Sequence, residues 1–405
     1  MKKYDVIIIG GGPAGMFSAI NIKNKKVLIL EKNDIVGRKL LMAGAGRCNI
    51  THSGKIKDFL DHYGKNYKFL KTALNKFKNE DSINFFKKNN LDIIEDKNGK
   101  IFPITEKSKD VKKLLLELCE GNGVRINYTE TVLKINKKEE IFLIETKKGN
   151  YECEYLIIST GGKSYPTSGS TGDGYKFAKK LGHKIIECKP ALTPVFIKNY
   201  ELAEISGVSL QKRIVSLYRD NKKIAEHIGD IGFTHTGLTG PGILDFSRNI
   251  ENEDLLKINL INESENDFRD IFIRETKENG KMLLGTLIKK YEIPKSLIRM
   301  ILGKLKIDSE LKLANIDKKT RNKIIENFCE HQFLVDEIGD YSIAMVTKGG
   351  IDLKEVSSKT MESKLVDKLF FAGEILDIDG DTGGYNIQAA FSMAFLISLE
   401  INSKI

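Results

Sequence analysis

Three glycines near the amino terminus, Gly10, Gly12 and Gly15, have the G-x-G-x-x-G spacing that lets a backbone approach a pyrophosphate. In this pattern the first glycine makes a tight turn, the second lies against the phosphates and the third packs a helix closely on a strand. An acidic residue, Glu31, follows about twenty positions later, where a carboxylate can accept hydrogen bonds from a ribose hydroxyl. These residues predict a dinucleotide-binding site.

A second group of chemistry-bearing residues lies in the stretch VGRKLLMAGAGRCNITH, residues 36 to 52. Arg38, Lys39 and Arg47 can balance phosphate charge, and the glycines among them permit close backbone approach. Cys48 has no partner at C-x-x-C spacing, so a disulfide-reductase cycle would need a distant thiol. We interpret Cys48 as a residue that lines a cofactor, with a redox nucleophile as the alternative.

The elements that position these residues follow from the apolar pattern. Residues 6–9 form a short apolar run typical of a buried parallel strand, residues 16–22 fit a helix, and residues 27–31 fit a second strand. This order places the glycines at the start of a helix, where backbone N–H groups face negative charge. The sequence therefore predicts a Rossmann-like α/β domain.

Two later segments favour FAD over a nicotinamide as the bound dinucleotide. A strand over 156–159 runs into Thr160, and a strand near 369–373 is followed by glycines that open a helix near 384. FAD extends across a doubly wound sheet, so its binding groups should come from both ends of such a chain. The sequence has no second strand–G-x-G-x-x-G–helix unit, so we expect one bound dinucleotide.

The composition is that of a globular protein with a basic excess. The 405 residues include 65 Lys and Arg against 55 Asp and Glu, which gives a formal net charge of +10. No apolar run approaches the roughly 20 residues that a membrane-spanning helix needs, so we expect a cytoplasmic protein with no membrane partner. The 5 cysteines are scattered, which argues against a disulfide framework and against a metal site.

Several longer strings together carry a family resemblance. The chain contains, in this order, GRKLLMAGAGRCNIT, TGGKSYPTSGSTGDGY, GLTGPGIL, VTKGGI, TMESK and FAGEILDIDGDTGGYNIQAAF. This combination resembles the YhiN/BaiN-like flavoproteins, also described as aminoacetone-oxidase-like FAD-binding enzymes or NAD(P)/FAD-dependent oxidoreductases. The resemblance extends over essentially the whole chain and implies an FAD-binding fold with an insert. One branch of the family is linked to reduction in bile-acid metabolism, but the resemblance transfers no substrate.

The resemblance also implies which residues hold FAD. The glycine motif and Glu31 would hold the adenosine diphosphate half, and residues 38–49 would lie along the pyrophosphate and toward the isoalloxazine. Residues 160–162 would close over the adenine side, and residues 373–388 would hold the ribityl chain and the flavin ring. The full set that we expect to bind FAD is Gly10, Gly12, Pro13, Ala14, Gly15, Glu31, Lys32, Arg38, Lys39, Gly46, Arg47, Cys48, Asn49, Val132, Thr160, Gly161, Gly162, Gly373, Glu374, Gly384, Tyr385, Asn386 and Gln388.

The expected fold is α/β, with a discontinuous Rossmann-like FAD-binding domain at residues 1–190 and 345–405. Short alternating apolar runs predict a β-rich insert over residues 191–265. Helical spacing of apolar residues predicts a helical insert over residues 266–344.

We therefore expect an FAD-dependent oxidoreductase that binds FAD tightly, takes electrons from NAD(P)H as a transient reductant, and acts on an unidentified small molecule. One alternative is an FAD-dependent amine or carbonyl oxidase that uses O2. Another is a flavin-stabilised module that binds nucleic acid, which no recognisable nucleic-acid motif supports. The sequence assigns no catalytic acid or base, since Tyr385 and His235 fit structural roles equally well. It does not specify an oligomeric state.

Overall fold

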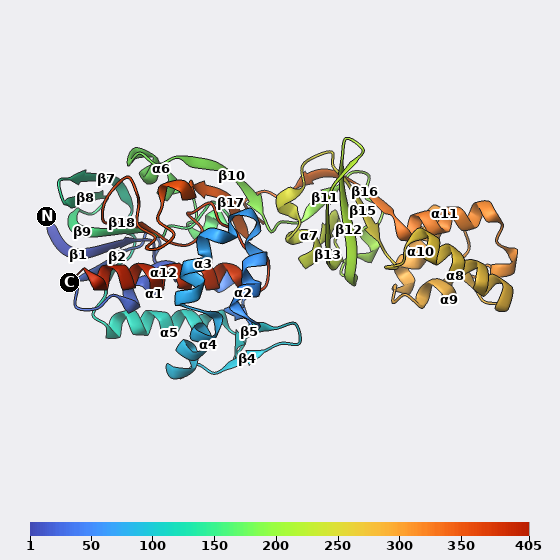
Figure 1. The fold of residues 1–405 in the computed structure, drawn as a ribbon, viewed down its shortest axis with the longest axis horizontal. Coiled ribbons are helices and arrows are strands. Elements are labelled where there is room, and N and C mark those ends of the chain that lie inside the picture. The colour runs from blue at the N-terminus through green and yellow to red at the C-terminus, as the bar shows by residue number, and fades with distance from the viewer. Residues whose placement is uncertain (405) are drawn as a thin grey trace. The chain divides into compact units, whose positions relative to one another are not determined.

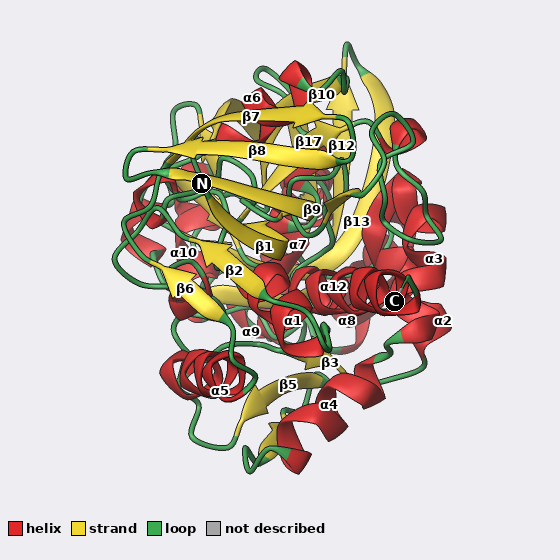
Figure 2. Ribbon diagram, turned by 90° about the vertical axis from the view of Figure 1, so that its left-hand side faces the viewer, coloured by secondary structure: helices red, strands yellow, loops and turns green. Residues whose placement is uncertain are grey.

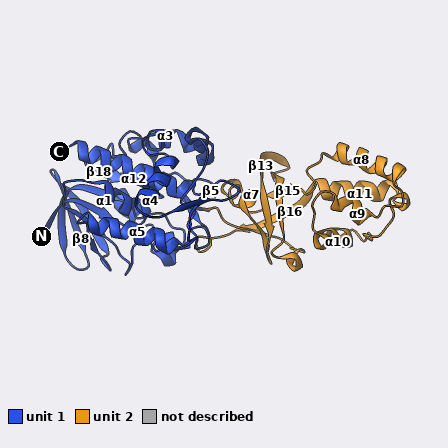
Figure 3. Ribbon diagram, turned by 90° about the horizontal axis from the view of Figure 1, so that it is seen from below, with its two compact units in different colours: residues 1–190, 344–405 blue, residues 191–343 orange. Residues whose placement is uncertain are grey.

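The computed structural model describes residues 1–404 and divides the chain into two compact units (Figure 3). Unit 1 comprises Met1–Pro190 and Ala344–Ile405, and unit 2 comprises Ala191–Ile343. Each unit has its own hydrophobic core. Figure 1 labels the elements along the chain.

Unit 1 is built around a seven-stranded sheet with the order β6-β2-β1-β9-β8-β7, in which β18 also pairs with β9. Its strands are β1 (Lys2–Ile9), β2 (Val27–Leu30), β6 (Arg125–Asn127), β7 (Val132–Lys138), β8 (Ile141–Thr146), β9 (Asn150–Ile158) and β18 (Leu369–Phe371). The pairs β6–β2, β2–β1, β1–β9 and β9–β18 are parallel, whereas β8 pairs antiparallel with both β9 and β7. β1, β2 and β9 end in runs of buried apolar residues, as expected of parallel strands covered on both faces.

Two helices from opposite ends of the chain lie against this sheet. Unit 1 contains the helices α1 (Pro13–Asn21), α2 (Ile56–Phe59), α3 (Tyr67–Lys76), α4 (Asn79–Lys88), α5 (Ser108–Gly121), α6 (Asp173–Lys180) and α12 (Tyr385–Ser403). α1 and α12 lie side by side under the strands (Figure 2), and the rings of Phe17 and Phe391 join them with centroids 4.7 Å apart. α12 is buried on nearly every side, which explains why its sequence is apolar without a clear polar face.

Two smaller sheets complete unit 1. They comprise β3 (Thr51–His52), β5 (Lys100–Pro103) and β4 (Ile93–Glu95) in one sheet, and β10 (Ile185–Ala191) with β17 (Val346–Ile351) in the other. β17 and β18 come from the last part of the chain, which returns to the domain in which the chain began.

Unit 2 contains a closed β-barrel and a group of helices. The barrel has the order β11-β14-β13-β12-β15-β16, with β11 (Val195–Ile197), β12 (Ser209–Arg219), β13 (Lys222–Phe233), β14 (Gly237–Thr239), β15 (Leu255–Asn259) and β16 (His331–Ile338). The short helix α7 (Pro241–Leu244) follows β14. The helical module, as we call it, consists of α8 (Glu265–Glu278), α9 (Leu284–Lys289), α10 (Lys295–Lys304) and α11 (Lys318–Cys329).

The barrel's last strand follows the helical module in the sequence. β16 lies within the range 266–344, for which the apolar spacing predicts helices, yet it pairs with β15 and β11 to close the barrel. Its alternating burial pattern is that of a half-exposed strand. No helix within residues 1–404 is long and apolar enough to cross a membrane.

Candidate cofactor site

Four parallel strands of unit 1 end at the same level. The register pairs Ile9 with Leu30, Ile9 with Ile158, and Ile158 with Phe371, so the residues that follow these strands meet at one edge of the sheet. The loops that leave this edge contain most of the residues expected to bind FAD. This is the edge at which ligands bind in open parallel sheets.

The glycine loop between β1 and α1 has the geometry that its spacing predicts. Gly10 has φ +101, and a Cβ on Gly15 would lie 2.1 Å from the carbonyl oxygen of Gly10. The third glycine therefore permits the close contact of helix and strand. A Cβ on Gly12 would meet no atom within 4 Å, so space opens beside the first turn of α1.

Glu31 is buried at the end of β2 and faces the glycine loop. Its Oε2 accepts a hydrogen bond from the backbone N–H of Gly11 at 2.8 Å, and its Oε1 accepts from the N–H of Asn33 at 2.8 Å. The neighbouring Lys32 forms an ion pair with Asp173 at 2.6 Å. The Asn33 side-chain amide also donates to Oε1 at 2.8 Å, which makes three donors. Since a carboxylate has about four acceptor sites, Glu31 keeps capacity for a ribose hydroxyl.

α12 begins at the same edge with a second glycine turn. Gly384 has φ +95 and precedes Tyr385, and the Asn386 side chain donates to the carbonyl oxygen of Gly380 and accepts from its N–H, both at 2.8 Å. Neither α1 nor α12 has a side-chain cap at its amino terminus. The uncapped first turns of these two helices present N–H groups that suit phosphate or carbonyl oxygens.

Buried polar atoms without a partner in the protein provide a test of whether FAD fits. The atoms Asn49 Oδ1, Thr51 Oγ1 and Thr160 Oγ1 are buried and have no hydrogen-bond partner. All three lie within or directly after the stretches that the sequence motifs assign to the cofactor. Because an unpaired buried polar group is costly, such a group is expected where a ligand supplies the partner. The donor and acceptor set therefore fits a nucleotide cofactor.

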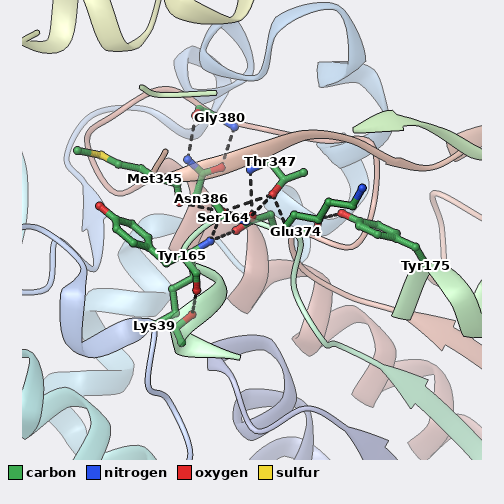
Figure 4. Close-up of polar contacts among 11 residues, drawn as sticks. Lys39, Ser164, Tyr165, Tyr175, Met345, Thr347, Glu374, Gly380 and Asn386 are labelled. Carbon is green, nitrogen blue, oxygen red and sulfur yellow. Dashed lines mark hydrogen bonds and ion pairs between the residues drawn. The ribbon is translucent and has the colours of Figure 1, made fainter. Parts of the chain in front are cut away.

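Lys39 and Glu374 form the centre of a polar network in the same unit (Figure 4). Lys39 Nζ lies 2.7 Å from Glu374 Oε2 and donates to Ser164 Oγ at 2.6 Å. Glu374 Oε1 accepts from the Ser164 hydroxyl at 2.7 Å and from the N–H of Thr347 at 3.0 Å. The network ties the loops after β2, β9 and β18 to β17, and it holds these loops in a fixed arrangement.

The glycines of the β9 and β18 loops are required by this network. A Cβ on Gly162 would lie 2.3 Å from Thr347 Oγ1 and 2.6 Å from Glu374 Oε1. Gly161 and Gly373 have φ values of +72 and +80, a conformation that favours glycine. These positions thus serve the packing of the loops as well as the approach of a ligand.

Tyr385 lies in a stack of aromatic rings. Its ring lies between those of His62 and His52, with centroids 3.9 Å and 5.4 Å away, and its carbonyl oxygen accepts from the Tyr63 hydroxyl at 2.8 Å. His62 Nδ1 lies 3.0 Å from Asp381 Oδ2. This packing fixes the start of α12.

Other expected residues have contacts that do not converge on the strand ends. Arg38 pairs with Asp34, and Arg47 pairs with Glu106 at 3.2 Å while its guanidinium lies 4.6 Å from the Phe102 ring centroid. Arg47 is exposed, whereas Arg38 is half-buried. The remaining expected residues take the following places: Pro13 and Ala14 in the first turn of α1, Gly46 in a turn with φ +87, and Val132 buried at the start of β7.

Gln388 is fully buried, and its side chain is engaged within the protein. Its Oε1 accepts from the Ser82 hydroxyl at 2.7 Å, and its Nε2 donates to the carbonyl oxygen of Phe77 at 3.2 Å and to Ser392 Oγ at 3.1 Å. These contacts join α12 to α4 and to the residue after α3. They give Gln388 a structural role.

Cys48 is fully buried and has φ +62. Burial raises the pKa of its thiol from 9.0 to about 12. At neutral pH the side chain is therefore a thiol, whereas a redox nucleophile needs a thiolate. Burial therefore disfavours the redox-nucleophile alternative for Cys48, whereas its place beside the cofactor stays a prediction.

Thr51, Ser164 and Thr347 are absent from the set of residues expected from the sequence. Each lies within or beside a string that carries the family resemblance, and this proximity was the available signal. The roles of Ser164 and Thr347 depend on contacts between residues 27 to 210 positions apart. Spacing within a single motif could not reveal them.

No group of three or more metal-ligating side chains occurs within residues 1–404. The polar groups at the carboxyl ends of the parallel strands are thus backbone N–H groups, hydroxyls and one lysine–glutamate pair. Such a donor set suits phosphates and a polar ring system.

Comparison with known proteins identifies the family to which this chain belongs. The HI0933-like protein Rossmann domain family matches residues 4–399. The chain belongs to this family. The Rossmann-type α/β fold with an additional β-barrel region and the resemblance to YhiN/BaiN-like flavoproteins are both confirmed.

Three curated relatives match nearly the whole chain. A ribosomal RNA dihydrouridine synthase of Haemophilus influenzae is 32% identical over 416 residues, which cover 100% of both proteins. A ribosomal RNA dihydrouridine synthase of Escherichia coli is 30% identical and covers 99% of this chain and 98% of its own. A 3-dehydro-bile acid delta(4,6)-reductase of Clostridium scindens is 26% identical and covers 96% of this chain and 97% of its own.

A solved structure supports the fold. The 3-ketosteroid-delta4-(5alpha)-dehydrogenase of Rhodococcus jostii superposes with a TM-score of 0.50 at 13% identity, covering 99% of this chain and 97% of the dehydrogenase. At this identity the likeness concerns the fold alone. Family membership together with the site confirms the expectation of an FAD-dependent oxidoreductase.

Proposed function

We propose that this protein is an FAD-dependent reductase that hydrogenates the C5=C6 bond of uracil bases in ribosomal RNA, with NAD(P)H as the electron donor. The observation that carries the proposal is the full-length similarity to two ribosomal RNA dihydrouridine synthases, at 32% and 30% identity. From the sequence alone, the lack of a nucleic-acid motif favoured a small molecule over nucleic acid. The two relatives reverse that preference, because their names state an RNA substrate.

The names of these relatives indicate one type of reaction, the reduction of a carbon–carbon double bond that is conjugated to a carbonyl group. Uracil carries a C5=C6 double bond conjugated to a carbonyl, and a delta(4,6) 3-dehydro-bile acid carries double bonds conjugated to its ketone. Bound FAD supplies hydride transfer to the carbon distant from the carbonyl. The adjacent carbon takes a proton, so that NAD(P)H provides a hydride, solvent provides a proton, and NAD(P)⁺ and the saturated base leave.

The chain's own residues would bind and orient the cofactor. The uncapped start of α1, with space beside Gly12, suits the pyrophosphate, and Glu31 suits the adenosine ribose. The uncapped start of α12 suits the pyrimidine edge of the flavin, where reduction builds negative charge. The unpaired hydroxyl of Thr160 and the unpaired amide oxygen of Asn49 would bond to the cofactor's polar groups.

The Lys39–Glu374 pair would position the loops rather than react. Glu374 is held by Lys39, by Ser164 and by the Thr347 N–H, so its carboxylate is well satisfied within the protein. A group with that many fixed partners is suited to keeping the loops after β2 and β18 together when the cofactor binds.

A second candidate is a reductase of a small conjugated ketone. The observation that favours it is the similarity to the bile acid reductase at 26% identity over nearly the whole chain. The oxidase alternative, with O2 as the acceptor, predicts instead that an amine and not NAD(P)H reduces the flavin.

The test uses the flavin-loaded protein with in vitro-transcribed, unmodified ribosomal RNA under anaerobic conditions. We expect NADPH or NADH to bleach the flavin, and nuclease digestion followed by mass spectrometry to detect dihydrouridine. Heat-denatured protein and omission of NAD(P)H serve as controls. Bleaching without dihydrouridine, together with turnover of a conjugated ketosteroid, would support the small-molecule reductase. Bleaching by an amine alone would support the oxidase.

A further inference from the structure

Charge is distributed unevenly among the helices of the helical module in unit 2. α8 carries five acidic residues, Glu265, Asp267, Asp270, Glu275 and Glu278, against three basic residues, Arg269, Arg274 and Lys277. Between residues 281 and 306, the segment that includes α9 and α10, one acidic residue, Glu292, accompanies the basic residues Lys281, Lys289, Lys290, Lys295, Arg299, Lys304 and Lys306.

α10 presents its basic residues as a row. Leu297, Ile298, Ile301 and Leu302 are buried in the core of unit 2 and fix the orientation of the helix. Lys295 and Arg299 are exposed and four positions apart on the helix, and the exposed Lys306 lies two residues after its end with φ +58. We call Lys295, Arg299 and Lys306 the α10 basic row.

The α10 basic row is not neutralised by the protein. Two other lysines of the segment have carboxylate partners, since Lys290 pairs with Glu275 at 2.7 Å and Lys304 pairs with Glu201 at 2.7 Å. The three residues of the row form no ion pair within residues 1–404. A Cβ on Gly303, within the row, would meet no atom within 4 Å, so a partner can approach the backbone there.

The surroundings of the row specify the kind of partner. The apolar residues of α10 are buried in the module, so the row has no apolar face that could enter a lipid surface. Tyr291 is half-buried and packs edge-on against Phe268, with centroids 5.4 Å apart, so it is not a platform on which a base could stack. The row therefore offers a partner positive charge, which suits the phosphates of a nucleic-acid backbone.

We propose that the α10 basic row binds the phosphate backbone of the RNA substrate. This inference rests on the proposed function, because it identifies the surface that would hold the ribosomal RNA while its uracil is reduced. The row contacts backbone rather than base edges, so it contributes affinity and orientation but no sequence preference.

The test compares two variants that each remove three positive charges from the helical module. The test variant combines Lys295→Gln, Arg299→Gln and Lys306→Gln, and the control combines Arg269→Gln, Arg274→Gln and Lys277→Gln on α8. Binding of the flavin-loaded proteins to a fluorescein-labelled RNA hairpin is measured by anisotropy over a range of salt concentrations. Far-UV circular dichroism and flavin absorbance confirm that each variant is folded and loaded.

We expect the test variant to bind RNA at least about tenfold more weakly at about 50 mM salt, with the control near wild type. The slope of log K against log salt should fall in magnitude by roughly 2–3, because each phosphate contact contributes about 0.7–0.9. Equal affinity and equal slope for the two variants would overturn the inference. Binding of the wild type to phosphatidylglycerol vesicles but not to RNA would also overturn it, in favour of a membrane surface.

The experiment tests the RNA-binding surface and the proposed reaction separately. If the wild type produces dihydrouridine while the test variant binds RNA like the control, the surface is wrong and the function stands. If the row binds RNA but no dihydrouridine forms, the surface stands and the proposed reaction is wrong. The single charge reversal Arg299→Glu provides a second variant should the triple variant fail to fold.

Discussion

The two units of this protein place their polar groups in opposite ways. In unit 1, polar atoms such as Asn49 Oδ1 and Thr160 Oγ1 are buried without a partner near the ends of parallel strands. In unit 2, the basic groups of α10 are exposed and separated from the acidic groups of α8. Buried unpaired groups are costly and persist where a ligand completes them, whereas exposed charges cost little and suit a large charged partner. The difference favours cofactor binding by unit 1 and macromolecular recognition by unit 2.

Unit 2 also contains buried polar atoms without a partner, at Tyr200, Arg213 and Arg321 and at the hydroxyl of Thr193. Thr193 lies between β10 and β11, outside the stretches assigned to the cofactor, and a Cβ on Gly339 would lie 2.3 Å from its hydroxyl. Unpaired buried atoms therefore occur in both units, and those of unit 1 indicate a site because Asn49, Thr51 and Thr160 lie in the stretches that the sequence motifs assign to the cofactor. Thr193 provides an internal control for the hydroxyls of unit 1.

The largest expected effect is the loss of FAD on Gly12→Asp. The position has φ −77 and extended ψ, and a Cβ added there would meet no atom within 4 Å, so aspartate fits and can cap α1. Its carboxylate would repel the pyrophosphate in a desolvated site. We expect FAD affinity to fall at least about a hundredfold, or about 3 kcal/mol, while the melting temperature of the flavin-free protein stays equal or rises. Flavin titration and circular dichroism measure the two quantities.

The matched substitution in unit 2 is Gly303→Asp, which also enters open space. It should leave FAD content unchanged and weaken RNA binding, because it places a negative charge in the α10 basic row. If both aspartates reduced FAD content equally, the division of labour between the units would be refuted.

The next effect concerns the acid stability of unit 2. His331 is buried in β16, and burial lowers its pKa from 6.5 to about 4. The folded protein thus keeps this ring neutral where the unfolded chain would protonate it. The neutral, buried His331 ring contributes about 3 kcal/mol to the free energy of unfolding. This contribution is present in full above pH 6.5 and is lost as the pH falls through about 4. Urea denaturation followed by circular dichroism should show this loss.

His331→Gln should remove most of the pH dependence between 6.5 and 4 while retaining a polar side chain near the Asn327 carbonyl oxygen. Flavin fluorescence, which reports release from unit 1, should respond to pH alike in the variant and the wild type. A variant with unchanged acid sensitivity by circular dichroism would show that other groups dominate.

The parts of the site on which these predictions depend could be predicted from the sequence to different degrees. The glycine loop, Glu31 and the start of α12 lie in short strings whose spacing specifies a turn and a helix start, so local physics was sufficient. The network of Lys39, Ser164 and Glu374 joins residues up to 335 positions apart, and its contacts depend on the completed sheet. No pattern within a single string encodes them.

The same limit applies to Gln388 and to the barrel. The family resemblance implied that Gln388 binds the cofactor, whereas its side chain contacts Ser82 and Ser392. Alternating residues predicted strands in the insert, but barrel closure requires β16, which follows the helices, to pair with β11. Strand order and closure are tertiary properties that alternation does not determine.

A smaller effect is expected from Thr160→Val, which removes the unpaired hydroxyl and keeps the side-chain shape. If the hydroxyl bonds to FAD, affinity should fall by about tenfold, equivalent to about 1.4 kcal/mol, while the flavin-free protein becomes no less stable. Thr193→Val should stabilise unit 2 by a similar mechanism and leave FAD affinity unchanged. Equal flavin affinities in the two variants would remove Thr160 from the site.

The smallest effect is expected from Cys48→Ser. The thiol is fully buried and its pKa is raised by burial to about 12, so near neutral pH it neither donates electrons as a thiolate nor reacts readily. The serine hydroxyl would be poorly solvated there, at a cost of about 1 kcal/mol in unfolding free energy. We expect FAD binding and most turnover to survive, and iodoacetamide to label the half-buried Cys188 before Cys48 in the native protein. Loss of turnover with FAD still bound would mean that the thiol takes part in the reaction, and unit 1 would then contribute a reacting group as well as a cofactor cradle.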